Sequence, residues 1–266
     1  MSYYGQGEAK FDGLVAWFIR QCRQVKAARL AKQLTPGGVV LDVGCGDGSF
    51  LSALGGCGDF ELHGLELDGL AARRARRDPR LHLHLGDLLA AGYPRERFDL
   101  VTLFHVFEHL AEPKRTLTEL YEIVKPGGSV VLSFPNAGSV QAQLFNGDWL
   151  HLDPPRHLFL LDPQTAEREF RRAGFSVIGR RFFSVEQNPF GFIQSVLNLV
   201  LADRDVLYER LKGNEGYAPR HGRWSLWLQK AVAGVLLGPA IVVDAVESAF
   251  GRGATVEYFL RKDPAE

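Results

Sequence analysis

A glycine-rich loop is the part of this chain whose residue types point most clearly to chemistry. An apolar run ends at Asp42, and Gly44, Gly46 and Gly48 follow at alternate positions. Glycine adopts left-handed backbone conformations and has no side chain to keep a ligand off the backbone. The chain becomes amphipathic after Ser49, so the backbone N–H groups of a helix start would face the loop. The pattern therefore predicts a ligand-binding cradle.

The glycine spacing narrows the choice of ligand. The dinucleotide fingerprint G-x-G-x-x-G, counted from Gly44, needs a third glycine where the chain has Ser49. This difference weakens the interpretation as a nicotinamide-dependent dehydrogenase. Cys45, inside the loop, is interpreted as a small residue that fits a tight turn and not as a nucleophile.

The elements that must position these residues alternate between strands and helices. Such alternation predicts an α/β fold with a Rossmann-like, doubly wound, seven-stranded, mostly parallel sheet and a helical insertion before the last strand. Ligands of such sheets bind at the carboxyl ends of the strands, where the loop at 42–48, Glu66, Asp87 and the segment 104–109 all lie. The predicted strands are 39–43, 61–67, 81–85, 98–103, 129–134, 175–182 and 255–261; the predicted helices include about 9–33, a helix from 49, 70–78, 114–124 and 163–173, and 125–128 is predicted to be a sharp turn.

Three parts of the chain are expected from this pattern. Residues 1–35 form an N-terminal helical segment, and residues 36–187 with 254–266 form the ligand-binding domain. Residues 188–253 form the helical insertion, which serves as a cap or as a membrane-surface element.

Motifs along the chain resemble the class I S-adenosylmethionine (SAM) methyltransferases, in the branch that includes the ubiquinone-biosynthesis O-methyltransferases and many small-molecule enzymes. The loop VVLDVGCGDGSF resembles the family's first motif, and FDLVTLFHVFEHL resembles its fourth-strand motif. KPGGSVVLSFPN is similar to the family's fifth strand and the turn before it, and HLDPPRHLFLLDPQTAEREFRRAGF is similar to a segment that follows it. The resemblance implies SAM as cofactor and S-adenosylhomocysteine as product.

The resemblance also implies which residues bind SAM. Glu66 would accept hydrogen bonds from the ribose hydroxyls, with Asp68 as the alternative, because a carboxylate can accept two such bonds. Asp87 would accept from the adenine amino group, although it could also simply cap a helix. Leu88 would form an apolar wall for adenine, and a buried carboxylate near the loop would help to hold the ammonium. The expected cofactor-binding residues are Asp42, Gly44, Cys45, Gly46, Gly48, Glu66, Leu67, Asp87, Leu88, Phe104 and His105.

Four histidines are candidates for a catalytic base. Methyl transfer from a sulfonium is an in-line displacement that needs a positioned acceptor and, for some acceptors, removal of a proton. Histidine suits that task near neutral pH. His157 is the first choice and His105 the second, with His109 and His151 as further candidates. Glu108 and His109 could hold a divalent metal, since a related group of ubiquinone enzymes uses acidic residues there, but His105 stands where an acid could stand, so no metal is expected.

The composition limits the partners. Apolar residues make up 46% of the chain, charged residues 23%, and the formal net charge is zero, so no global positive field draws the protein to nucleic acid. Three cysteines without a paired framework indicate a reducing compartment. The first residues lack the apolar core and cleavage site of a signal peptide. A cytoplasmic location is expected, or a peripheral one at the inner face of the membrane.

The insertion contains an apolar segment with three open interpretations. Its uninterrupted apolar run, 231–243, contains Pro239 and is shorter than the roughly 20 residues that span a bilayer. It could form a helical cap over the acceptor pocket or a homodimer interface. It could also be an interfacial membrane anchor, given the nearby Trp224 and Trp227, and the acceptor would then be lipid-linked.

The leading function is therefore a SAM-dependent methyltransferase, with O-methylation of a small-molecule, lipid-linked or glycan acceptor. The alternative is a non-catalytic protein of the same fold, a scaffold or partner protein recruited to a membrane surface. The presence of Glu66 and Asp87 argues against that alternative, because a domain without cofactor has no need of either residue.

Overall fold

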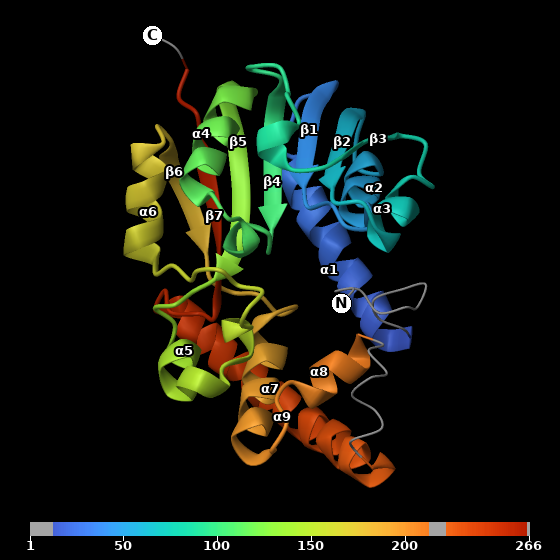
Figure 1. The fold of residues 1–266 in the computed structure, drawn as a ribbon, viewed down its shortest axis with the longest axis vertical. Coiled ribbons are helices and arrows are strands. Elements are labelled where there is room, and N and C mark those ends of the chain that lie inside the picture. The colour runs from blue at the N-terminus through green and yellow to red at the C-terminus, as the bar shows by residue number, and fades with distance from the viewer. Residues whose placement is uncertain (1–12, 213–221, 265–266) are drawn as a thin grey trace. The chain divides into compact units, whose positions relative to one another are not determined.

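The structure of the protein, a computed structural model, describes residues 13–212 and 222–264 (Figure 1). The predicted helix start near residue 9 lies outside these described residues. The chain divides into two compact units. In the described residues, we call them the sheet unit (residues 20–134, 163–180 and 257–264) and the helical unit (residues 13–19, 135–162, 181–212 and 222–256).

The sheet unit is built on a seven-stranded sheet with the strand order β3-β2-β1-β4-β5-β7-β6. β1 pairs in parallel with β2 and β4, β2 with β3, and β4 with β5. The Gly127 N–H near the start of β5 donates to the Lys262 carbonyl just after β7, so β7 runs antiparallel to β5. The predicted doubly wound, mostly parallel sheet is confirmed. The strands are β1 (Gly38–Val43), β2 (Phe60–Glu66), β3 (Leu81–Leu85), β4 (Phe98–Phe104), β5 (Val124–Pro135), β6 (Ser176–Arg181) and β7 (Thr255–Arg261).

Apolar layers cover both faces of the sheet. On one face, Ala27 of the first helix packs in a buried cluster with Val40 of β1 and Val131 of β5. Side chains alternate across a strand, so Phe134, three residues after Val131, points to the other face, where it contacts Phe170. The helices associated with this unit are α1 (Gly13–Ala31), which begins in the helical unit, α2 (Ser49–Gly55), α3 (Leu70–Ala75), α4 (Pro113–Ile123) and α6 (Pro163–Arg172).

β5 starts earlier than the sequence predicts. The expected turn at 125–128 and the expected strand from Ser129 form one strand in the structure. The pairing with β4 shifts between Phe98–Val124 and Leu100–Ser129, so residues 125–128 form a bulge within the strand. The prediction was wrong because a Pro-Gly-Gly sequence signals a turn locally, whereas the neighbouring strands hold it in the sheet.

The helical unit contains the predicted insertion, whose described residues, 188–212 and 222–253, form α7, α8 and α9. Ile193 of α7, Leu207 of α8 and Ala240 of α9 form its buried apolar cluster. The segment 135–162, which the sequence analysis assigned to the ligand-binding domain, groups with the insertion in this unit. The helices are α5 (Val140–Phe145), α7 (Asn188–Val200), α8 (Val206–Leu211) and α9 (Arg223–Ala249).

α9 is much longer than its uninterrupted apolar run. It has 27 residues and continues through Pro239. Its residues Trp224–Ala249 contain an 18-residue window with a mean hydropathy of 1.7 and are long and apolar enough, by length and composition, to cross a membrane. The uninterrupted run 231–243 is therefore only part of a longer apolar helix, because the polar residues beside this run do not end the helix.

Candidate functional site

The glycine loop follows β1 with the backbone that its sequence predicts. Gly44, Gly46 and Gly48 have φ values of 71°, 59° and 74°, all in the left-handed region. A Cβ atom on Gly44 would lie 2.4 Å from Cγ2 of Val106, whereas a Cβ atom on Gly46 would meet nothing within 4 Å. Gly46 thus places bare backbone beside open space, which is the arrangement that a ligand cradle needs.

Glu66 holds this loop from the end of β2. Its Oε2 accepts a hydrogen bond from the Gly46 N–H at 2.7 Å, and its Oε1 accepts from the next backbone N–H in the chain at 3.0 Å. The N–H groups of Gly44 and Cys45 donate to the Leu65 carbonyl at 2.7 and 3.1 Å. These bonds join the loop to β2 and keep the Glu66 carboxylate against the cradle.

Asp42 is a buried carboxylate directly before the loop. Thr102, its paired residue on β4, donates from Oγ1 to Asp42 Oδ1 at 2.6 Å. Burial raises the pKa of Asp42 to about 7, against the lowering effect of the Thr102 hydrogen bond; Glu66 adds to the rise, and Lys26 and Arg23 oppose it. Because an opposite charge stabilises a buried carboxylate, a ligand ammonium beside Asp42 would be favoured.

α1 supplies cations beside the loop that sequence reasoning missed. Arg23 hydrogen-bonds the Ser49 hydroxyl, and its Nη1 lies 3.7 Å from Oδ1 of Asp47. Lys26 Nζ lies 4.1 Å from the centroid of the Phe104 ring at the end of β4. The sequence carried no signal for this placement, because basic residues on a helix are ordinarily solvated.

The other residues predicted to touch the cofactor differ in their exposure and in their hydrogen bonds. Asp87 caps the short helix η1 (Leu88–Ala90), accepting at Oδ1 from a backbone N–H two residues on at 2.8 Å. Leu88 is 3% exposed and Leu67 is 66% exposed, so Leu67 offers surface to a ligand while Leu88 packs inside. Phe104 is half-buried at the end of β4. The helix-capping role that the sequence allowed for Asp87 is thus present.

Cys45 is a packing residue of the loop. Its side chain is buried against β2, where a Cβ atom on Gly64 would lie 2.8 Å from its Sγ. Burial raises the pKa of the Cys45 thiol well above its usual range. A thiol is a poor nucleophile compared with a thiolate, so Cys45 fills space in the turn.

His105 and His109 follow β4 in the sheet unit. His105 has a left-handed backbone with φ 54°, and its N–H donates to the Ser133 carbonyl at 2.9 Å. Its Nδ1 lies 3.5 Å from Oε1 of Glu108, whose side chain is 2% exposed. A buried carboxylate therefore lies beside the His105 ring. His109 ends the short helix η2 (Phe107–His109) and is half-buried.

His157 and His151 belong to the helical unit. His157 Nδ1 lies 2.7 Å from the His151 carbonyl oxygen. A carbonyl only accepts, so Nδ1 carries the proton and Nε2 is the basic nitrogen of the neutral ring. The His151 ring is buried edge-on to Trp149, and a Cβ atom on Gly191 would lie 2.7 Å from its Nε2. His151 is therefore a packing residue of this unit.

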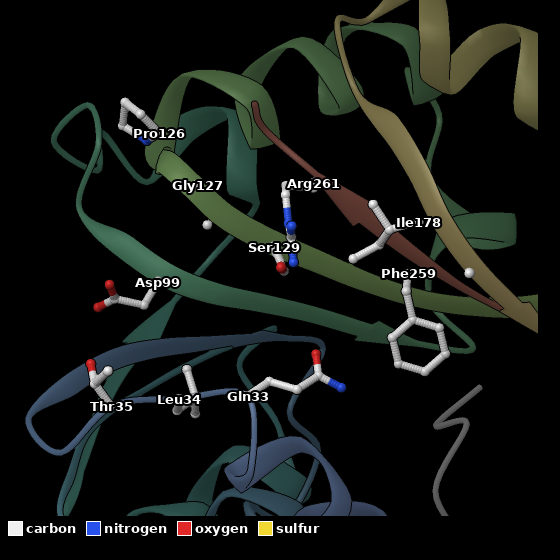
Figure 2. Close-up of a pocket in the computed structure, with 12 residues that line it drawn as sticks. Gln33, Leu34, Thr35, Asp99, Pro126, Gly127, Ser129, Ile178, Phe259 and Arg261 are labelled. Atoms are coloured by element: carbon white, nitrogen blue, oxygen red, sulfur yellow. The ribbon is translucent and has the colours of Figure 1, made fainter. Parts of the chain in front are cut away.

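A cavity of about 680 Å³ lies at the other end of the strands, near the amino ends of β4 and β5 (Figure 2). Asp99 at this cavity accepts from the Val39 N–H at 2.8 Å and from Lys125 Nζ at 2.7 Å. These bonds link the amino ends of β1, β4 and β5. The residues predicted to bind SAM lie at the carboxyl ends, so this cavity is separate from the candidate site.

A second hollow, of about 700 Å³, adjoins the glycine loop. Asp47 and Ser49 of the loop line it together with arginines of α1, of α3 and of the segment after α3. In the sheet unit, the loop, Glu66, Asp42 and His105 therefore lie at the carboxyl ends of the strands. Arginine side chains line the hollow beside the loop. The lining arginines are Arg20, Arg23, Arg74, Arg77 and Arg80.

Comparisons with known sequences agree with this arrangement. A family model described as a methyltransferase domain matches residues 16–179, more than half of the chain. A protein of Mycolicibacterium smegmatis, named as a probable S-adenosylmethionine-dependent methyltransferase, is 31% identical over 134 residues, which cover 49% of this chain and 51% of that protein. A ubiquinone biosynthesis O-methyltransferase of Cereibacter sphaeroides is 29% identical over 185 residues, 63% of this chain and 69% of that protein. The chain thus spans about half the length of the first of these relatives.

Solved structures share the fold. The cyclase SpnF superimposes with a TM-score of 0.60 at 19% identity, covering 98% of this chain and 86% of that chain. A Haemonchus contortus phosphoethanolamine N-methyltransferase, solved with S-adenosyl-L-methionine, has a TM-score of 0.55 at 15% identity, covering 92% of this chain and 53% of that chain. At these identities the likeness shows the fold alone.

Proposed function

The chain belongs to the methyltransferase-domain family, and from this premise we propose that it transfers a methyl group from S-adenosylmethionine to an oxygen atom of a small-molecule, lipid-linked or glycan acceptor. The observation that carries the proposal is the hydrogen bond from the Gly46 N–H to Glu66. It sets a carboxylate against open loop backbone at the carboxyl ends of neighbouring strands, where open α/β sheets bind their ligands.

The residues at this edge suit SAM. The bare backbone at Gly46 leaves room for the cofactor, since a side chain there would project into open space. The two oxygens of Glu66 match a pair of ribose hydroxyls. Asp42, whose pKa burial raises to about 7, would be stabilised as a carboxylate by the ammonium of the methionine part. When bound, SAM supplies a methyl group made electrophilic by its sulfonium.

The chain's own catalytic task is to position the acceptor and take its proton. His157 remains the first candidate for the base, because the bond from Nδ1 to the His151 carbonyl directs the basic lone pair to Nε2. His105 remains the second candidate, with Glu108 beside its ring. His109 is the third, and we propose that no metal takes part.

The choice of oxygen as acceptor atom is supported by relatives named ubiquinone biosynthesis O-methyltransferase. The Cereibacter sphaeroides protein, with 69% of its length covered, is named an O-methyltransferase. The proposal of a non-catalytic scaffold has no support from the two relatives described above, which are named for methyl transfer. We propose a cytoplasmic protein that needs no nucleic acid partner.

The test separates cofactor binding from transfer, because the fold also occurs in a protein named a cyclase. Calorimetry should show that the full chain binds both SAM and S-adenosylhomocysteine. Incubation with labelled SAM and a demethylated quinol, then with catechol and glycan probes, should give labelled product and S-adenosylhomocysteine. No binding of either cofactor form would favour the scaffold, and binding without transfer to any oxygen acceptor would reject O-methylation.

A further inference from the structure

α9 turns polar residues inward and exposes apolar residues, which is the reverse of an ordinary surface helix. Such helices turn an apolar stripe inward. In α9, however, Gln229, Asp244 and Glu247 are 3%, 0% and 6% exposed. Among the described side chains of α9, the exposed ones are apolar apart from Lys230. We call this set the outer face: Trp224, Trp227, Leu228, Lys230, Ala231, Gly234, Val235, Leu237, Gly238, Pro239, Val242, Ala245, Val246 and Ala249.

Specific bonds inside the helical unit hold α9 in this rotation. Asp244 Oδ1 accepts from Asn188 Nδ2 of α7 at 2.6 Å and from the Ser248 hydroxyl at 3.1 Å. Glu247 Oε2 accepts from Gln141 Nε2 of α5 at 3.2 Å. Burial raises the pKa of both carboxyls. Turning the helix to bury its apolar side would break these bonds, so the outer face is a stable property of the unit.

The chain path shows how such a helix can meet a bilayer. α9 lies between β6 and β7 in the chain, and these strands are neighbours in one sheet. A single crossing between them would place them on opposite sides of the membrane, so an even number of crossings is required. Among the described residues, α9 is the one helix long and apolar enough to cross. A membrane contact made by α9 would therefore lie along the membrane surface and not across it.

The ends of α9 carry the residue types that favour a lipid interface. Trp224 and Trp227, 83% and 62% exposed, have ring centroids 6.2 Å apart at one end, and Phe250, 79% exposed, follows the other end. Tryptophan is enriched at headgroup level. Lys230 and Arg252 are exposed, whereas both acids of α9 face inward. We propose that the outer face of α9 docks in the plane of an anionic lipid bilayer surface.

The charge of the outer face favours a bilayer over a second copy of the chain as its partner. Gly234 and Gly238 are four residues apart, and a Cβ atom on either would meet nothing within 4 Å, so another helix could approach closely there. The one charge on the outer face is the positive charge of Lys230, so a second copy of this face offers no opposite charge. Anionic headgroups do, and they also accept the tryptophans.

Vesicle flotation of the full chain tests the proposal. The wild type should float with vesicles of phosphatidylcholine and phosphatidylglycerol. Val235→Glu should lower the bound fraction roughly tenfold, because it replaces an exposed apolar side chain, which the docked bilayer would bury, by a charge that anionic lipid repels. The matched control is Val25→Glu, which places the same charge at a 70% exposed valine of α1 and should leave flotation unchanged.

A fluorescence measurement tests the same docking with a variant that is checked for folding, so that misfolding of Val235→Glu cannot explain the result. Brominated lipid should quench wild-type tryptophan emission, and the quenching should fall at least twofold in a Trp224→Phe/Trp227→Phe variant with unchanged thermal unfolding. A wild type that stays unbound would overturn the proposal, as would an equal loss in Val25→Glu. A dimer that Val235→Glu dissociates, without vesicle binding, would assign the face to a second copy instead. None of these readouts depends on methyl transfer.

Discussion

The glycine loop and α9 use polar side chains in opposite ways. At the loop, Glu66 and the cations Arg23 and Lys26 of α1 gather around open backbone at one edge of the sheet. In α9, Asp244 and Glu247 turn inward, and the exposed side is apolar.

This difference indicates what each surface meets. A surface that assembles fixed charges around bare backbone suits a small charged ligand, because charges of the ligand can pair with them there. A surface that turns its carboxylates inward and exposes apolar side chains suits the anionic bilayer surface that we propose for it. The two regions therefore carry two separable properties, which mutation should affect independently.

The largest effect is expected when the base is removed, and it shows which unit supplies it. His157→Gln should lower kcat by about 10²–10⁴-fold and leave SAM affinity unchanged, because general base catalysis contributes that much. His105→Gln is the matched variant in the sheet unit. Steady-state kinetics and calorimetry on both variants give the answer. Unchanged turnover in His157→Gln removes it from the mechanism and leaves His105 as the candidate.

The next effect is expected at the loop. Glu66→Ala should weaken SAM binding about 100-fold, since it removes charged hydrogen bonds to the ribose and to the Gly46 N–H. Asp68→Ala is the control and should change the Kd less than threefold. Vesicle flotation should be the same for both variants. If Asp68→Ala is the more damaging, the ribose role passes to Asp68.

A smaller effect is expected from the titration of Asp42. Its pKa is about 7 in the folded protein and 3.8 without the fold, so the folded state binds the proton more tightly. The stability contributed by this proton is present at low pH and is lost as pH rises from about 4 through 7. Asp42→Asn should remove about 2 kcal/mol of that decline, as urea unfolding at pH 5 and pH 8 would measure. Parallel pH curves for wild type and variant would contradict the shift.

The smallest effect is expected from a chelator. EDTA should change methyl transfer by less than twofold, because the sulfonium activates the methyl group without a metal. Dialysis against EDTA, followed by rate measurement with and without added Mg²⁺ or Zn²⁺, makes the comparison. A loss that one of these ions restores would place a metal in the site.

Most of the fold could be predicted because its signals are local. The apolar run before Asp42, the three glycines after it and the alternation of strands and helices each lie within short stretches of sequence. The exception in the sheet is the start of β5, where a turn signal was overridden by pairing with β4.

The site was predicted less completely, since part of it depends on contacts between distant segments. Thr102 of β4 donates a hydrogen bond to Asp42 of β1. The sequence indicated this bond only by placing a polar residue, Thr102, in an apolar run, since a buried polar side chain needs a hydrogen-bond partner. Arg23 reaches the loop from α1, and no spacing rule connects the two. The rotation of α9 depends on partners in α5 and α7, so a count of apolar residues could not show which side faces out.

The place of β7 in the sheet has a consequence for biosynthesis. β7 is the last strand in the chain, yet it pairs between β5 and β6. Until α9 has been made and β7 follows it, β5 and β6 expose edges whose backbone groups can pair with other chains. Pairing across such a long stretch of sequence is slow. A nascent chain therefore displays an open sheet and the apolar side of α9 together, and early capture of α9 by lipid would keep that helix from aggregating while the last strand inserts.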